Sequence, residues 1–475
     1  MRSVDRHPDD RVDNAEPGKP AVSRYAVCLT ALLSLAMIGL NHDFDVVGGR
    51  FEETVTSGGG LEEKSAFERS VVRADAQRLI GFLVLLTVGG LALLGPPQQL
   101  RPKLDTITVL ALAALGWAVL SFVWSTSPNE TARELVRLLG FTFTGAALVR
   151  RFSLRELMFL FATICLVSIA VDVAADIAAG TFQPWTRGFR LGGTLHANHM
   201  GRLGAIVALI GWMMLGNGRL LSLSSALITT GVVVVLMSGS RSGTLGLVAG
   251  LAAMQIIGLP RRRICLIVSG ASAIAAIGLF VVAVLPPSTH RLVTQAVLMG
   301  RTEDSASLTG RVPLWQEMWR DASERMGHGF GYGAYWTVDR NYQMGEAIEW
   351  FPRHSHSAYL ELFVDLGLVG VLLVVTLAMA AVARCIRLAV TTGRPEYRLL
   401  GALLICAMAN GFLEVNFVAP RFEGLFVGMA VLVLALRPAE SAAAVASDRM
   451  APAPAGSPRS EFEMRTNHAS RPYLT

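Results

Sequence analysis

Two apolar runs joined by a short polar turn, ALITTGVVVVLMSGSRSGTLGLVAGLAAMQIIGL at residues 226–259, decide the class of fold. Both runs are long enough to cross a bilayer as α-helices. The turn carries Arg241, and a guanidinium beside hydrocarbon is costly unless it reaches the interface or meets a charged partner. The stretch therefore predicts two membrane helices whose connecting turn holds an arginine for one of those two reasons.

The composition extends this prediction to the whole chain. Of the 475 residues, 52% are hydrophobic and only 16% are charged, and the mean hydropathy is +0.47. Apolar runs of roughly 20 residues recur without the alternation of a membrane β-strand, so we expect an all-α, polytopic helical bundle of about twelve transmembrane helices. The predicted spans are residues 25–41, 79–95, 105–124, 134–149, 157–178, 200–215, 221–237, 243–258, 264–285, 357–381, 399–416 and 422–437.

The distribution of basic residues predicts the orientation of this bundle. With the amino terminus in the cytoplasm, the short connections with paired or clustered basic residues, such as Arg150 with Arg151 and Arg261 to Arg263, fall on the same side, and the basic side of a membrane protein is cytoplasmic. We expect a cytoplasmic segment at 1–24, a transmembrane domain at 25–437 and a disordered cytoplasmic tail at 438–475. The net charge of +6 is interpreted as this topology signal, so no nucleic acid is expected as a partner.

Two long connections then lie on the outer side, at residues 42–78 and 286–356. The second contains GRVPLWQEMWRDASERM, whose helical spacing places one apolar face opposite charged residues. We expect an amphipathic helix lying at the outer membrane surface. Its predicted apolar face consists of Val312, Trp315, Met318, Trp319 and Ala322.

Arginines also fall on the predicted outer face, where the topology rule does not place them. They are Arg187, Arg190, Arg241, Arg311 and Arg353. One guanidinium group can bind two phosphate oxygens side by side, so a cluster of arginines at the membrane border suits a phosphate or diphosphate ligand. Ser240 and the neighbouring glycines favour close approach of such a ligand. The alternative for Arg241 is an arginine that merely extends to the interface.

A second candidate stretch, RLGGTLHANHMG at residues 190–201, precedes a predicted span. It combines a glycine turn with His196, Asn198 and His199, which are able to donate hydrogen bonds to a substrate. The alternative is that His196 or Asn198 caps the next helix. No carboxylate or cysteine lies at zinc-ligand spacing, so no metal site is predicted.

A third stretch, RHSHSAYLELFVDLGLVGVLL, leads from the long outer connection into a span. His354 and His356 stand where the loop becomes a helix, and a histidine there suits a general base toward a sugar hydroxyl. Glu361 or Asp365 is a candidate to orient that histidine. The alternative is a polar residue that starts the helix.

Acidic residues inside predicted spans favour a different function. Asp172, Asp176 and Glu414 all lie in such spans, and buried carboxylates are typical of proton or ion pathways. They support a transporter, such as a flippase or an ion-coupled carrier, as the alternative to an enzyme. Broken helices in symmetric positions, which would favour a carrier, are not evident in the sequence.

Taken in order, five motifs resemble the bacterial O-antigen ligase and polymerase family. They are WSTSPNETARELVRLLG, GGTLHANHMG, SGSRSG, TGRVPLWQEMW followed by GHGFGYGAYW, and HSHSAYLELFVDLGLVG, and together they cover residues 105–381. Many members of the family have Asn and Glu where this chain has Ser357 and Asp365, and His354 is a second candidate base.

The resemblance implies a metal-independent, inverting glycosyltransferase with no cofactor in the bacterial inner membrane, with its active site on the periplasmic face and both termini cytoplasmic. Arg241 and Arg311 would hold the diphosphate of an undecaprenyl-linked oligosaccharide, and His356 would act as the base. The remaining substrate-binding candidates are Arg190, His196, Asn198, Ser240, Arg353 and His354.

The same resemblance implies the partners and leaves the acceptor open. Another repeat unit as acceptor would make the protein an exopolysaccharide or O-antigen polymerase, and a lipid A core would make it a ligase. We favour the polymerase, because the extended first loop and tail suggest an exopolysaccharide system. Membrane lipid, a chain-length regulator and a flippase are the further partners expected.

Overall fold

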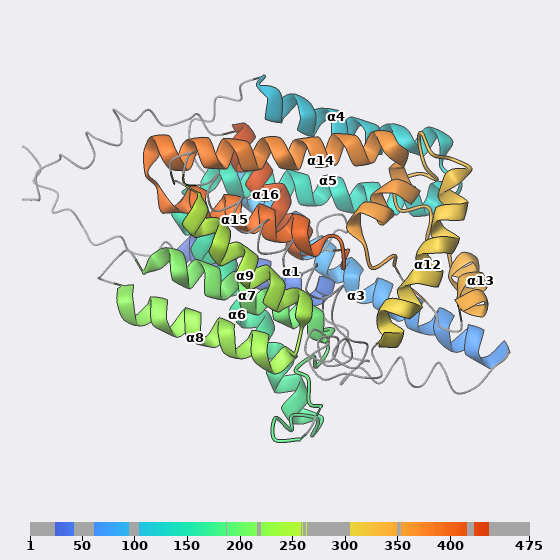
Figure 1. The fold of residues 1–475 in the computed structure, drawn as a ribbon, viewed down its shortest axis with the longest axis horizontal. Helices are drawn as coiled ribbons and strands as arrows, with labels where there is room; N and C mark the ends of the chain where they lie inside the picture. Colours follow the sequence, from blue (N-terminus) through green and yellow to red (C-terminus); the bar gives the residue numbers. More distant parts are fainter. Residues whose placement is uncertain are drawn as a thin grey trace, which may run out of the picture.

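The protein folds as a helical assembly (Figure 1). The structure, a computed structural model, describes residues 24–41, 61–94, 104–186, 188–215, 220–257, 259, 263, 305–348, 352, 354–415 and 422–436. Within these ranges all regular secondary structure is helical, which confirms the predicted class. The helices are α1 (Arg24–Asn41), α3 (Leu61–Leu94), α4 (Thr106–Leu120), η2 (Ser121–Trp124), α5 (Pro128–Arg151), α6 (Leu154–Ala178), α7 (Ala197–Met214), α8 (Leu221–Ser238), α9 (Arg241–Ile256), α12 (Ser305–Ser323), α13 (Val338–Ile348), α14 (Ala358–Thr392), α15 (Pro395–Asn410) and α16 (Phe422–Leu436).

Each predicted span that falls on described residues overlaps one of these helices, and the predicted span 264–285 lies outside them. Four stretches are long and apolar enough to cross a membrane: Thr106–Trp124, Leu154–Ala178, Leu221–Ser238 and Ala358–Thr392. Shorter apolar helices cover Val27–Leu40, Arg78–Leu94 and Gly424–Leu436. The number of crossings stays a prediction. Helix α3 already begins at Leu61, inside the stretch 42–78 that was predicted as a loop.

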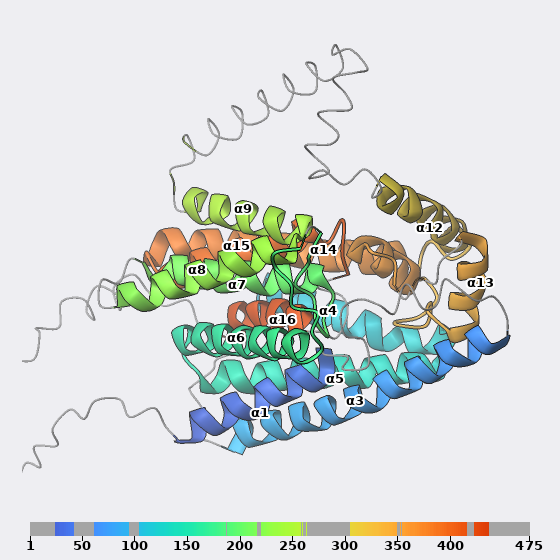
Figure 2. The same cartoon turned by 90° about the horizontal axis from the view of Figure 1, so that it is seen from below.

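Most helices run along the long axis of the molecule, whereas α12 and α13 stand across it at one end (Figures 1 and 2). Helix α7 packs against α8, α9 and α6, and α15 packs against α9 and α14. Helix α14 also lies along α4, and α3 lies between α1 and α5. The main apolar core is shared by these packed helices.

Glycines let α7 and α8 approach each other closely. A Cβ built on Gly231 of α8 would lie 2.4 Å from the carbonyl oxygen of Gly204 in α7. Small residues at such contacts let helix backbones touch, which is the usual basis of helix association in membranes. This contact fixes α7, whose first turn carries part of the candidate site.

Helix α14 is broken at Gly367, which the sequence did not predict. Gly367 has φ 66° and ψ −170°, so the backbone leaves the helix for one residue. Carbonyl groups just before the break accept hydrogen bonds from outside the helix: Val364 from the Phe330 N–H (2.8 Å) and Leu366 from the Trp117 indole (3.0 Å). The glycine-rich segment 327–333 therefore docks onto the break, and the Trp117 indole ties α14 to α4 beside it.

Helix α12 is present within residues 286–356, which were predicted as the long outer connection, but its buried face differs from the predicted one. Leu314, Met318 and Ala322 are buried against α13 and α14. By contrast, Val312 and Trp319, expected on the packed apolar face, are 45% and 57% exposed. The buried line runs at four-residue spacing from Leu314, so the helix is rotated from its predicted setting.

Candidate active site

The SGSRSG turn places Arg241 as the first residue of α9. Helix α8 ends at Gly239, whose left-handed φ of 55° lets the chain turn. The Ser240 hydroxyl then caps α9 by accepting a hydrogen bond from the Gly243 N–H (3.0 Å), and it lies 3.1 Å from the Ser242 hydroxyl. The turn thus fixes where the Arg241 side chain leaves the backbone.

A glycine contact presses this turn against α7. A Cβ on Gly243 would lie 2.7 Å from the carbonyl carbon of Gly201, and a Cβ on Gly201 would lie 2.5 Å from the Ser240 Cβ. Side chains do not fit at such distances. The two glycines therefore bring the start of α7 and the start of α9 to one place.

If the protein is the glycosyltransferase that the sequence predicts, we expect Gly243→Ala to lower glycan transfer on the order of 100-fold, because an added methyl group must push Arg241 away from α7, and misplacements of about 1 Å have such effects. The matched control is Gly116→Ala in α4, where a Cβ would meet nothing within 4 Å. Product formation by the two purified variants checks this. Equal activity of both would contradict the placement of Arg241.

Two buried carboxylates hold the glycine turn that precedes α7. The Asp172 Oδ1 accepts hydrogen bonds from the backbone N–H groups of Thr194 (2.7 Å) and Leu195 (3.0 Å), and from the Thr194 hydroxyl (2.9 Å). The Asp176 Oδ2 accepts one from the Gly193 N–H (3.1 Å). These contacts give both acids a structural role, because they anchor the turn that presents the residues after it.

The first residues after this turn form the next part of the site. The His196 Nδ1 accepts a hydrogen bond from the Asn198 N–H (3.2 Å), so His196 caps α7, as one of the two readings predicted. Arg190 donates to the Ser238 carbonyl (3.1 Å) and to the Asn198 Oδ1 (3.1 Å). Asn198 therefore faces Arg190 with its oxygen and is free to donate with its amide nitrogen to another group.

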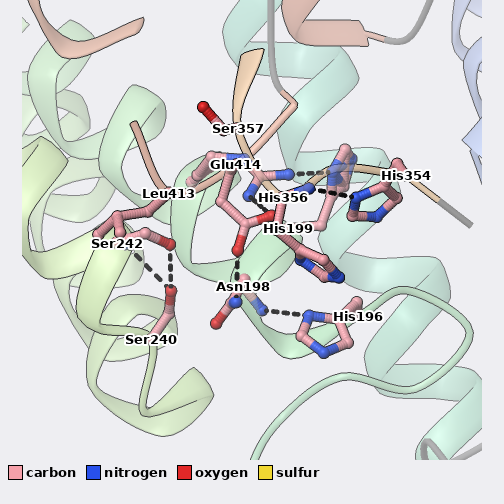
Figure 3. A network of polar contacts seen from close by, with 12 residues as sticks. His196, Asn198, His199, Ser240, Ser242, His354, His356, Ser357, Leu413 and Glu414 are labelled. Carbon is pink, nitrogen blue, oxygen red and sulfur yellow. Dashed lines mark hydrogen bonds and ion pairs between the residues drawn. The ribbon is translucent and has the colours of Figure 1, made fainter. Parts of the chain in front are cut away.

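That other group is Glu414, which lies in the turn after α15. Its Oε1 accepts a hydrogen bond from the Asn198 Nδ2 at 2.7 Å. Two guanidinium groups pair with the same carboxylate, Arg202 at 3.6 Å and Arg311 at 3.7 Å. Glu414 is 7% exposed and joins segments that are far apart in the sequence (Figure 3).

Arg311 reaches this carboxylate from α12. Its guanidinium also donates to the Leu413 carbonyl (3.1 Å), and its side chain is 19% exposed. Burial lowers the pKa of Arg311 from its ordinary value, the Glu414 carboxylate opposes that shift, and the like charge of Arg241 adds to it. The guanidinium groups of Arg241 and Arg311 are therefore close enough to repel each other.

The two candidate bases share one tight turn before α14. His356 has a φ of 53°, a left-handed conformation that is uncommon for a residue with a side chain. Its N–H donates to the His354 Nδ1 (3.2 Å), and the two rings lie 4.1 Å apart between centroids. Strain of this kind is found where a fold holds a side chain for function.

Neighbouring elements hold this turn in place. The Glu361 Oε2 accepts from the Ser355 N–H (3.0 Å), and the Trp315 indole donates to the Ser355 carbonyl (2.7 Å). Asp365 instead accepts from the Gly333 N–H (3.0 Å) and so anchors the glycine-rich segment. Of the two acids proposed to orient the histidine, Glu361 supports the backbone of its turn.

The structure brings most of the predicted site residues into one cluster. The cluster consists of Arg190, His196, Asn198, Ser240, Arg241, Arg311, His354 and His356, together with Arg202 and Glu414. Arg187 and Arg353 lie outside the described residues. We refer to this set as the arginine cluster.

The sequence analysis did not assign Arg202 or Glu414 to the site. Arg202 is buried in α7, where its guanidinium lies 3.2 Å from the His199 Nδ1. A buried arginine and a buried glutamate in different predicted spans were a signal that each needs a partner. Burial alone would raise the pKa of Glu414, which lies beyond the end of α15, but Arg202, His356, Arg311 and His196 together lower it.

The arginine cluster has the chemistry of an anion site. Four guanidinium groups, those of Arg190, Arg202, Arg241 and Arg311, belong to it, and Glu414 supplies its carboxylate. An excess of fixed positive charge in a partly buried place is stabilised by a ligand with more than one negative charge. Phosphate oxygens are the preferred partners of such groups.

Part of this chain is similar to known proteins. Residues 224–375 match the model of the O-antigen ligase family. The chain is also 27% identical over 137 residues to the exopolysaccharide production protein ExoQ of Rhizobium meliloti (strain 1021). That alignment covers 28% of this chain and 32% of the relative, so the chain spans about a third of the relative's length. Residues 224–375, which hold Arg241, Arg311 and both candidate bases, are thus similar to the O-antigen ligase family.

Proposed function

We propose that the protein is a membrane glycosyltransferase of polysaccharide biosynthesis, which transfers a glycan from undecaprenyl diphosphate to an acceptor sugar. The observation that carries the proposal is the convergence of Arg241 and Arg311 with His356 from three separate segments. This transfer needs a positively charged site for the diphosphate and a base for the acceptor hydroxyl. The arginines supply the first, and the histidine supplies the second.

The reaction follows from these groups without a metal ion. A hydroxyl oxygen of the acceptor attacks the anomeric carbon of the donor glycan from the side opposite the diphosphate. The carbon–oxygen bond to the diphosphate breaks, and the diphosphate leaves with the bonding electrons. Arg241 and Arg311 stabilise the charge that develops on it, and His356 takes the proton of the hydroxyl. The configuration at the anomeric carbon is therefore inverted.

Arg190 and Asn198 extend the site beside these groups. The Arg190 guanidinium is held at the Ser238 carbonyl, next to the turn that starts α9. It therefore serves a phosphate or sugar oxygen that lies near Arg241. In this proposal, the periplasmic face of the inner membrane holds the site, and the lipid tail of the donor stays in the bilayer.

The acceptor is a further repeat unit in our proposal, which makes the protein a polymerase that works with a chain-length regulator and a flippase. The relative named for exopolysaccharide production supports this choice over a lipid A core. The buried acids that favoured a transporter have partners in the fold: Asp172 and Asp176 hold the turn before α7, and Glu414 meets Asn198.

The test is a reaction with purified full-length protein and an undecaprenyl-diphosphate-linked repeat unit, with and without a lipid A core and with and without a metal chelator. We expect lipid-linked glycans of two and more repeat units, formed equally with and without the chelator. Product only on the lipid A core would show a ligase instead. No product with either acceptor, or a strict requirement for a divalent cation, would contradict the proposal.

A further inference from the structure

Glu414 is the acidic residue of the arginine cluster, and the proposed reaction gives it no role. It lies in the turn after α15, outside the family match at residues 224–375. Its carboxylate is buried and takes a 2.7 Å hydrogen bond from Asn198. A site that is proposed to bind a diphosphate therefore contains a buried carboxylate, whose negative charge repels such a ligand.

The contacts of Glu414 with the arginines are looser than its contact with Asn198. Charge-assisted N–H···O bonds usually measure about 2.7–2.9 Å. Arg202 and Arg311 stand 3.6 and 3.7 Å from the carboxylate oxygens. The hydrogen bond from Asn198 thus fixes the position of the carboxylate. The two guanidinium groups are held near it by charge attraction, and their longer distances let them move to another anion.

The backbone around Glu414 is fixed to the elements that carry the other site residues. The Ala358 N–H, two residues after His356, donates to the Gly411 carbonyl (2.8 Å). Arg311 donates to the Leu413 carbonyl (3.1 Å), and the Tyr359 hydroxyl donates to the Met408 carbonyl (2.8 Å). Glu414 therefore has a set position relative to Arg311 and to the base, so its charge acts at a defined place.

We propose that Glu414 is the internal counter-ion of the diphosphate site, which holds Arg202 and Arg311 when no donor is bound and gives them up to the phosphates when the donor arrives. The inference rests on the proposed function and adds a positioning residue to it. A buried cluster of guanidinium groups would repel itself without an anion. The same anion opposes the product diphosphate, so Glu414 weakens binding and speeds release.

The test uses geranyl diphosphate, a short soluble polyprenyl diphosphate, as the probe with purified full-length protein. Glu414→Gln keeps the size and the hydrogen bond from Asn198 but removes the charge. We expect it to bind geranyl diphosphate about tenfold more tightly at low ionic strength, because a competing charge is lost. In the transfer reaction we expect KM for the donor to fall and kcat to fall with it, because diphosphate release slows.

The matched control is Glu317→Gln on α12, which removes the same charge from a glutamate paired with Arg320, outside the cluster. We expect it to bind the probe as the wild-type protein does. Suppose that the wild-type protein binds geranyl diphosphate and loses this binding when Arg311 is replaced. Unchanged or weaker binding of the probe by Glu414→Gln would then overturn the counter-ion role alone. Wild-type binding that does not depend on Arg241 or Arg311 would overturn the proposed diphosphate site itself.

Glu414→Gln could fail to fold because its arginines lack a neutralising charge, and a second pair of variants covers that case. Arg311→Gln removes one positive charge, and combining it with Glu414→Gln restores the net charge of the wild-type cluster. We expect the double variant to bind geranyl diphosphate more tightly than Arg311→Gln alone, again by about tenfold. Equal or weaker binding by the double variant would exclude the counter-ion role.

Discussion

Replacing Arg241 or Arg311 with alanine is expected to lower glycan transfer by a factor of roughly 100 to 1,000 while the protein stays folded in the membrane. In the proposed reaction, each guanidinium stabilises negative charge that grows on the diphosphate as the bond to the sugar breaks. The effect should appear mainly in kcat, because this charge is greater in the transition state than in the bound donor. Transfer rates with a lipid-linked repeat unit, measured beside thermal unfolding in detergent, check the prediction.

The control for Arg311 lies on the same helix. Arg320→Ala removes an arginine whose side chain is 71% exposed and paired with Glu317, so it should leave transfer near the wild-type rate. Arg241→Lys and Arg311→Lys should recover only part of the lost activity, since an ammonium group does not bind two phosphate oxygens side by side. Wild-type rates in Arg241→Ala and Arg311→Ala would refute the role of the arginines.

Replacing His356 with glycine is expected to remove transfer by about 100-fold or more without loss of stability. Glycine adopts the left-handed φ of 53° without strain, whereas it cannot take the proton of the acceptor. The variant should therefore unfold at the same temperature as the wild type or higher, and it should still bind geranyl diphosphate. The rate of transfer, the affinity for geranyl diphosphate and the unfolding temperature should be measured on the same preparation.

The companion variant His354→Ala separates the two candidate bases. It removes the ring contact with His356 and the acceptor of the hydrogen bond from the His356 N–H, so we expect a loss of activity of about tenfold or less, from a loosened turn. If His354→Ala lost as much activity as His356→Gly, or more, the base would have to be reassigned to His354. Retained transfer in His356→Gly would exclude His356 from proton transfer altogether.

The helices of the predicted spans were largely predictable, because each follows from a run of apolar residues closed by turn residues, whereas the polar helix α13 was not predicted. The predicted span 221–237 matches α8, Leu221–Ser238, since Gly239 ends the run with a left-handed residue. The break at Gly367 was not predictable, because a single glycine inside an apolar run has the same local sequence in a straight helix. It arises from a tertiary contact with the segment at Gly327.

The candidate site was predictable in its residue types but not in its connections. Arg241, Arg311 and His356 were predicted as site residues because polar and charged residues beside apolar runs are costly unless they have a partner or a function. Glu414 was noticed only as a buried acid, since its partner Asn198 is 216 positions away and no local pattern links the two. The rotation of α12 was missed for a related reason: Trp319 suits a buried face as well as Leu314 does, and only packing decides between them.

The most direct test of the account is a structure of the full-length protein with an undecaprenyl-diphosphate-linked donor bound. We expect the diphosphate between the guanidinium groups of Arg241 and Arg311, with phosphate oxygens at hydrogen-bonding distance, about 2.7–2.9 Å, from both. The imidazole of His356 should face the anomeric carbon from the side away from the diphosphate. A diphosphate bound elsewhere, with both arginines still turned toward the protein, would contradict the account.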